Sequence, residues 1–127
     1  LSQWLECGSV RFVGHLPTRT YARLLKSSHV HCYLTRPFVA SWSLLDAMSS
    51  GCCLVASDLQ VVRELADVAG TSWVDHRDHK ALVGTLERAL NFSPTERNAC
   101  GVLQRERAIR SWDRRLSLKR WRGLLGI

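Results

Sequence analysis

The chain has 127 residues, of which 46% are hydrophobic, with five cysteines and a formal net charge of +7. This length supports one domain with a modest core, no apolar run approaches the roughly 18 residues of a membrane-spanning helix, and no secretory signal pattern opens the chain. An odd number of cysteines without a Cys-x-x-Cys pair argues against a disulfide framework and a zinc site, and favours a reducing, cytoplasmic location. Because the chain begins at Leu1 rather than Met, we expect a fragment of a longer protein.

The positive charge is concentrated at the C-terminal end. Residues 1–103 carry ten basic and nine acidic side chains, a net charge of +1, whereas residues 104–127 carry eight basic and two acidic side chains, a net charge of +6. Such a segment suits the phosphates of a nucleic acid or an anionic membrane surface, and a solvated helix face is the plain alternative.

Runs of apolar or alternating residues, bounded by turn residues, predict four strands. They cover residues 10–15, 30–34, 52–56 and 71–74. Helical spacing and end signals predict helices between and after these strands. They cover residues 19–27, 42–50, 59–66, 79–90 and 94–110, with N-cap candidates Thr18, Ser41, Asp58, Asp78 and Ser93. Residues 111–113, Ser-Trp-Asp, predict a further cap, and a last helix follows to about residue 125.

Strands that alternate with helices predict an α/β fold, a Rossmann-like parallel sheet with flanking helices. The near-continuous apolar run at residues 52–56 is typical of a strand buried on both faces. We expect the strands at residues 10–15, 30–34 and 52–56 to lie in one sheet. Near the C-terminus, Ile109, Trp112 and Leu116 form a stripe that is expected to pack on the sheet, leaving a basic outer face.

Residues 37–58 form the most informative stretch, which predicts a loop, a short helix ended by Gly51, and a buried strand. In an open parallel sheet, the loop that leaves the carboxyl end of a strand binds anionic ligands together with the following helix N-terminus. Ser41 and Ser43 lie where this loop meets the helix, and Asp46 lies in the helix behind them. Backbone N–H groups for phosphate and a carboxylate for ribose hydroxyls would suit a nucleotide.

Three segments carry a resemblance to a known family. They are Arg-Phe-Val-Gly-His-Leu-Pro at residues 11–17, Asp-Ala-Met-Ser-Ser-Gly-Cys-Cys-Leu-Val-Ala-Ser-Asp at 46–58, and Ser-Trp-Asp at 111–113. Together they resemble the C-terminal half of the family 4 retaining glycosyltransferases, which have the GT-B fold of two Rossmann-like domains facing a cleft. The resemblance covers nearly the whole chain. It implies the donor-binding domain of an enzyme that moves a sugar from a nucleoside diphosphate sugar to an acceptor hydroxyl.

The resemblance also assigns roles to individual residues. Asp46 matches the acid that binds the donor ribose, Ser41 a loop glycine facing the donor phosphates or sugar, and Gly14 the strand-end glycine near the base. Phe38 stands where the family has a glutamate that contacts the donor sugar, and a phenyl ring cannot accept a hydroxyl hydrogen bond. The expected donor-binding residues are Gly14, His15, Phe38, Val39, Ala40, Ser41 and Asp46, with no catalytic residue, metal or cofactor in this half.

Phe38 leaves a second interpretation open, a non-catalytic nucleotide-binding or protein-interaction module. A nucleic-acid-binding domain is favoured only by the basic tail. The expected partners are the nucleotide-sugar donor, the missing N-terminal domain, which in the family carries the catalytic histidine, and an anionic membrane surface at the basic C-terminal helix. No specific nucleic acid is expected, and the predicted location is cytoplasmic or peripheral at a membrane.

Overall fold

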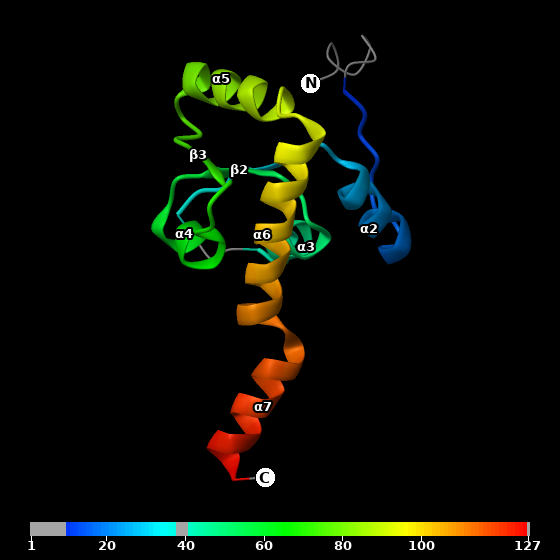
Figure 1. Ribbon diagram of the computed structural model, residues 1–127, viewed down its shortest axis with the longest axis vertical. Helices are drawn as coiled ribbons and strands as arrows, with labels where there is room; N and C mark the ends of the chain where they lie inside the picture. The colour runs from blue at the N-terminus through cyan, green and yellow to red at the C-terminus, as the bar shows by residue number, and fades with distance from the viewer. Residues whose placement is uncertain (1–9, 38–40, 127) are drawn as a thin grey trace.

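A computed structural model describes residues 10–37 and 41–126 and has an α/β architecture (Figure 1). Three parallel strands form an open sheet in the spatial order β1-β2-β3. The strands are β1 (His31–Tyr33), β2 (Leu54–Ser57) and β3 (Ser72–Val74). The helices are α2 (Thr18–Ser27), α3 (Trp42–Ser50), α4 (Gln60–Ala66), α5 (His79–Leu90), α6 (Pro94–Trp112) and α7 (Arg114–Leu125).

The central strand β2 is buried along its whole length, as its apolar sequence predicts. In register, Leu54 pairs with His31 of β1, and Val55 pairs with Ser72 of β3. Successive side chains of a strand point to opposite faces of the sheet. Leu54 and Ala56 therefore join one core, and Val55 joins a second core on the other face.

The two cores place helices on both faces of the sheet. The larger core contains apolar side chains from α2, α3 and α4, and the smaller one contains Ala89, Leu82 and Leu86 from α5. The largest fully buried apolar side chains of the larger core are Leu44, Met48, Leu54 and Val62. The predicted parallel sheet with flanking helices is confirmed at this level.

The prediction of a strand at residues 10–15 is wrong. Phe12 is 82% exposed, and none of residues 10–15 pairs with β1, β2 or β3. Gly14 has a φ of 62°, in the left-handed region, which interrupts the extended backbone that a strand requires. Helix α2 begins shortly afterwards, with Pro17 as its N-cap, and packs against α3. Residues 10–15 therefore do not form a strand beside β1.

The predicted helix ends are correct where a capping residue or a glycine close in sequence sets them. Helix α3 spans its predicted bounds and stops at Gly51, which has a φ of 74°. Helix α6 begins with a complete capping box, in which the Ser93 hydroxyl accepts from the N–H of Glu96 and the Glu96 carboxylate accepts from the N–H of Ser93. The Asp78 side chain caps α5 as predicted, and within the cap predicted at residues 111–113 it is the Asp113 side chain that caps α7.

Two of the predicted N-caps are wrong. Thr18 lies inside α2, and Leu59 rather than Asp58 is the N-cap of α4. The Asp58 carboxylate instead accepts two hydrogen bonds from the guanidinium of Arg63, at 2.6 and 3.0 Å. This charge-assisted, bidentate pair uses both oxygens of the Asp58 carboxylate, which explains why Asp58 pairs with Arg63 rather than capping α4.

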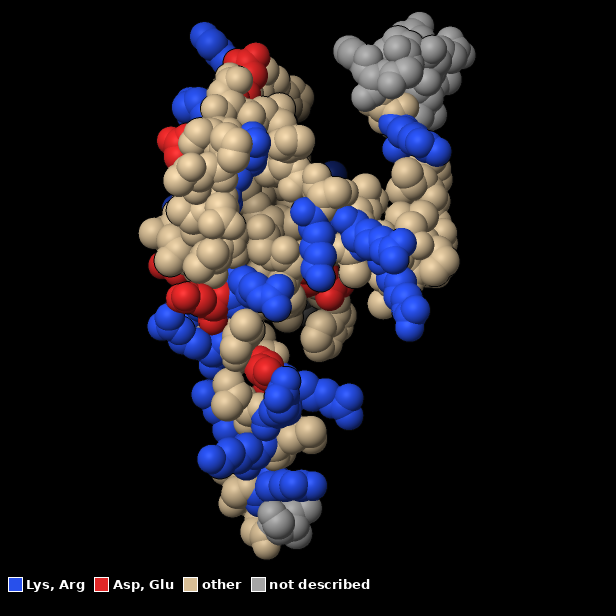
Figure 2. All heavy atoms as spheres, turned by 45° about the vertical axis from the view of Figure 1, so that its right-hand side comes forward, with Lys and Arg blue, Asp and Glu red and all other residues tan. Residues whose placement is uncertain are grey.

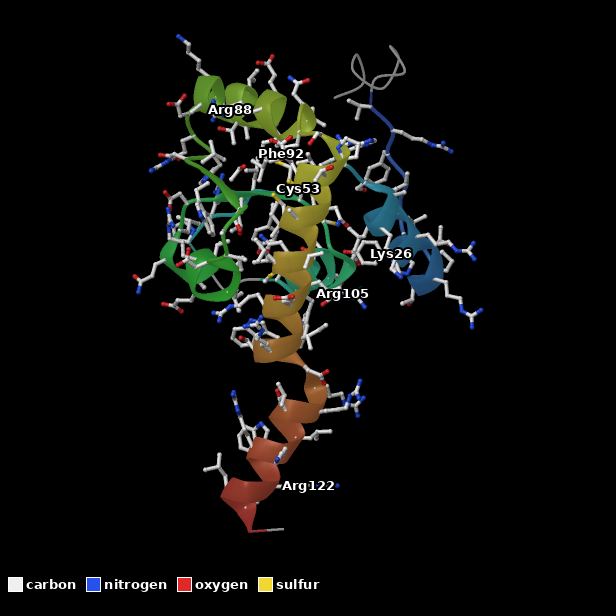
Figure 3. All side chains as sticks on the ribbon, in the orientation of Figure 1. Lys26, Cys53, Arg88, Phe92, Arg105 and Arg122 are labelled. Atoms are coloured by element: carbon white, nitrogen blue, oxygen red, sulfur yellow. The ribbon has the colours of Figure 1, made fainter. Side chains whose placement is uncertain are left out.

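Helix α6 crosses α3 at two glycines. A Cβ atom on Gly101 would lie 2.2 Å from the carbonyl oxygen of Gly51, so the two backbones approach as closely as glycine allows. The buried stripe continues through Gln104 and Ala108, and Arg105 Nη1 donates to the carbonyl oxygen of Ser49 at 3.2 Å (Figure 3). Helix α6 therefore approaches α3 most closely where Gly101 meets Gly51.

The expected packing of Ile109, Trp112 and Leu116 on the sheet is wrong. Their side chains remain 50%, 43% and 37% exposed. Helices α3 and α4 already supply the core on that face of β2, so α6 packs on α3 and these apolar side chains do not reach the strands. Cys32 of β1 is exposed, whereas Cys52 and Cys53 are buried.

Helix α7 extends beyond the end of α6, away from the sheet (Figure 1). None of its residues is buried. Within residues 10–37 and 41–126, no helix combines the length and the apolar character needed to cross a bilayer.

Candidate functional site

The N-terminus of α3 is fixed to the end of β1 by one side chain. The backbone N–H of Ser41, the N-cap residue, donates to the phenolic oxygen of Tyr33 at 2.9 Å. Tyr33 is the last residue of β1 and is only 7% exposed. The tyrosine therefore positions the start of α3 at the carboxyl edge of the sheet.

Two hydroxyls lie together at this helix start. The Oγ atoms of Ser41 and Ser43 are 2.6 Å apart, and Ser41 makes no side-chain capping bond although it occupies the N-cap position. The first N–H groups of any α-helix lack acceptors within the helix, and that end carries a partial positive charge. The N–H groups and the serine hydroxyls together suit an anionic ligand.

Asp46 lies about one turn further along α3, and its residue is exposed. It neighbours Tyr21 of α2, whose pKa is raised above its usual value, mainly by burial and secondarily by the charge of Asp46. An exposed carboxylate can accept hydrogen bonds from the paired hydroxyls of a ribose. Asp46 and the Ser41–Ser43 pair thus share one helix, as the sequence predicts.

The structure shows no contact that brings Gly14 or His15 to this group within residues 10–37 and 41–126. Gly14 and His15 are exposed and precede α2. Within residues 10–37 and 41–126, no hydrogen bond joins His15 to Ser41 or Asp46. Phe38, Val39 and Ala40 lie outside the described residues, so their expected contact with a donor sugar stays a prediction.

A cavity of about 750 Å³ lies at the same edge of the sheet, where the chain leaves each strand. Parallel strands bring their carboxyl ends together, so residues that directly follow β1, β2 and β3 line this cavity. The lining residues are Arg36, Pro37, Asp58, Leu59, Asp75, His76, Arg77 and His79. We call this space the carboxyl-edge cavity.

Both carboxylates of the carboxyl-edge cavity are held in their charged form. The hydrogen bonds from Arg63 lower the pKa of Asp58. The hydrogen bonds from Arg77, at 3.1 Å from its side chain and 3.0 Å from its backbone N–H, lower the pKa of Asp75. The Arg63 guanidinium also stacks over the ring of Trp73, 4.5 Å from its centroid. These pairs make the cavity polar with little net charge.

Sequence reasoning missed the carboxyl-edge cavity, although a signal was present. Asp75 directly follows the predicted strand at residues 71–74, and Asp58 lies two residues beyond the predicted strand at residues 52–56. Parallel topology brings such residues to one edge of the sheet. The sequence predicts Asp58 only as an N-cap, and no motif in it assigns a role to Asp75. Among the residues that the structure describes, no group of three or more His, Cys, Asp or Glu side chains is arranged to hold a metal ion.

An apolar groove of about 430 Å³ begins beside Ser41. Trp42 and Leu45 of α3, Val61 and Leu65 of α4, and Trp112 of α6 supply most of its lining. Trp42 is 81% exposed, and its ring offers a flat surface on which a base or sugar ring can stack. The α3 N-terminus therefore has polar groups at its tip and an aromatic ring beside them.

Comparison with known proteins gives no match: no family model, no curated protein and no solved structure matches the chain. The function is therefore inferred from the chain's own residues. An exposed carboxylate, two linked hydroxyls and the first N–H groups of a helix can together bind a ligand that carries both phosphate and hydroxyl groups.

Proposed function

We propose that this chain is the donor-binding part of a retaining glycosyltransferase and holds a nucleoside diphosphate sugar at the N-terminus of α3. The observation that carries the proposal is the placement of Asp46. It is an exposed carboxylate about one turn behind the linked Ser41 and Ser43 hydroxyls, on a helix that follows a parallel strand. The resemblance of residues 46–58 to the family 4 glycosyltransferases supplies the sugar-transfer chemistry.

Each group has a role in this proposal. The first N–H groups of α3 and the two serine hydroxyls bind the diphosphate, and the positive end of the helix stabilises the charge that develops on the leaving diphosphate. Asp46 accepts the ribose hydroxyls. Tyr33 is a positioning residue, since its phenolic oxygen holds the N–H of Ser41.

The full enzyme would supply the acceptor site and the catalytic base from a second domain. Proximity and base catalysis both require those groups, so the 127-residue chain alone is expected to bind the donor without turning it over. A non-catalytic nucleotide-binding or protein-interaction module is the alternative. Sugar transfer by the full-length protein would exclude this alternative. A full-length protein that binds the donor but transfers no sugar would support the alternative.

The first experiment measures binding to the chain itself. Isothermal titration calorimetry with UDP, GDP and ADP compares the unmodified chain with Asp46→Ala. We expect Asp46→Ala to weaken binding by about 1–3 kcal/mol, the range for losing hydrogen bonds to a charged acceptor. Glu87→Ala, which removes an exposed acid from α5, is the matched control and should bind as the unmodified chain does.

Two outcomes would contradict the proposal. Equal affinities for the unmodified chain and Asp46→Ala would remove Asp46 from the site. Binding that is lost in Arg36→Ala and His76→Ala but retained in Asp46→Ala would place the nucleotide in the carboxyl-edge cavity instead.

A further inference from the structure

Helix α7 carries large apolar side chains that the described part of the chain leaves exposed. Leu118, Trp121, Leu124 and Leu125 are 49%, 62%, 79% and 63% exposed. The helix is fixed at its start, where the Asp113 carboxylate accepts from the N–H of Arg115 at 2.7 Å, and from there it extends away from the sheet (Figure 1). Apolar side chains gathered on one projecting helix are typical of a surface that binds a partner.

Helical spacing places an apolar face of α7 beside a basic one, with Arg114 in line with the apolar face and Arg120 outside both. Leu118, Trp121 and Leu125 follow i, i+3, i+7 spacing and form an apolar face. Arg115, Lys119 and Arg122 follow i, i+4, i+7 spacing and form a neighbouring basic face. Figure 2 shows Lys and Arg side chains around the α7 end of the molecule, and in Figure 3 Arg122 extends outward from the helix.

The basic charge of α7 is unopposed within the helix. Residues 114–125 contain five basic side chains and no acid. The two acids nearest in sequence have partners, because Glu106 accepts from Arg110 at 2.7 Å, and Asp113 caps α7 and pairs with Arg115, whose Nε atom lies 3.6 Å from its carboxylate. The partner of this helix should therefore be anionic and should also accept leucine and tryptophan side chains.

We propose that α7 binds the surface of an anionic membrane, lying in the interface with its apolar face inserted and its basic face at the lipid phosphates. A helix with Lys and Arg on one face and Trp and Leu on the other has this preference. Nucleic-acid phosphates would satisfy the basic face but would leave Leu118 and Leu125 in water, so the observations favour lipid. This proposal does not depend on the function proposed for α3.

The test measures sedimentation of the 127-residue chain with vesicles. Vesicles of equal parts phosphatidylcholine and phosphatidylglycerol should bind the chain, vesicles of phosphatidylcholine alone should bind it far less, and raising the salt from about 0.1 M to about 1 M should release it. Equal binding to both kinds of vesicle would overturn the proposed anionic preference.

A matched pair of charge reversals tests the basic face. Lys119→Glu with Arg122→Glu should weaken binding at least 30-fold, because each basic side chain near an anionic surface is worth about 1 kcal/mol. Arg23→Glu with Lys26→Glu makes the same change in charge at the same spacing on α2 and should have a much smaller effect. Equal losses in the two variants would show that overall charge, and not α7, carries the binding.

A second pair tests the apolar face. Leu118→Ala with Leu125→Ala should weaken vesicle binding at least tenfold, whereas Leu116→Ala, which changes a leucine on the opposite side of α7, should have little effect. Because no residue of α7 is buried, thermal unfolding should be unchanged in all these variants. Two results together would show that the membrane proposal is wrong. The chain would fail to bind anionic vesicles, and it would form a dimer that Leu118→Ala with Leu125→Ala disrupts. The apolar face would then be an interface between copies.

Discussion

Substitution of Gly101 by alanine should destabilise the protein, although alanine is the better helix former. The added Cβ atom would lie 2.2 Å from the carbonyl oxygen of Gly51 and 3.1 Å from its carbonyl carbon. Both are backbone atoms, so no side-chain rotation relieves the contact. Helices α3 and α6 must separate by roughly 1 Å, a gap that already removes a quarter to a half of the dispersion energy of the atoms along it.

The expected size of the effect follows from two opposing contributions. Overpacking of a well-packed site costs about 1–3 kcal/mol and occasionally more, and the carbonyl contact at Gly101 belongs at the upper end of that range. The helix propensity of alanine returns up to about 1 kcal/mol. We therefore expect Gly101→Ala to lower the free energy of unfolding by about 2 kcal/mol.

Urea unfolding followed by circular dichroism measures this difference, and Gly84→Ala is the matched control. Gly84 also lies inside a helix, but the nearest atom to its added Cβ is a terminal nitrogen of Arg88 at 3.8 Å, an ordinary contact. At Gly84 only the higher helix propensity of alanine changes the stability, so Gly84→Ala should stabilise the protein by about 0.5–1 kcal/mol. If Gly101→Ala proves as stable as the unmodified protein, the close crossing of α3 and α6 is incorrect.

Two further predictions concern β1 and β2. The fully buried Ser57 hydroxyl accepts from the N–H of Thr35 at 2.9 Å, so Ser57→Ala should leave that N–H unpaired and destabilise the fold by about 1–3 kcal/mol in urea unfolding; an unchanged midpoint would refute the role of this bond. Burial lowers the pKa of His31, so the unfolded chain takes up a proton at higher pH than the folded one, and stability should fall as the pH drops below about 6.5. His31→Gln should show a smaller loss of stability than the unmodified protein between about pH 7.5 and pH 5.5, and equal losses would contradict the prediction.

The features predicted correctly from the sequence are those set by neighbouring residues. The capping box at Ser93 and the glycine stop at Gly51 act within four or five residues, so they can be read without knowledge of the fold. The apolar run that became β2 is similarly self-contained, although the strand itself is Leu54–Ser57 rather than residues 52–56. On the candidate site, the same local reasoning placed Ser41 and Asp46 on α3 correctly.

The incorrect predictions depended on contacts between distant residues. Residues 10–15 have the composition of a strand, but a strand needs a sheet edge beside it, and neither that edge nor the left-handed φ of Gly14 can be inferred from alternation alone. The face by which α6 packs depends on the shape of α3. The prediction chose the face that carries the large side chain of Ile109, whereas α6 packs through the face that carries Gly101. The bond from Ser41 to Tyr33 spans a loop and leaves no pattern in the sequence.

The glycine crossing also affects how the domain folds. The register pair His31–Leu54 is 23 residues apart in sequence and Val55–Ser72 is 17 apart, whereas Gly51 and Gly101 are 50 apart. Contacts that close longer loops carry a larger entropic penalty before they form. We therefore expect the sheet and its adjoining helices to assemble before α6 docks on α3, and the release of α6 to be an early step of unfolding.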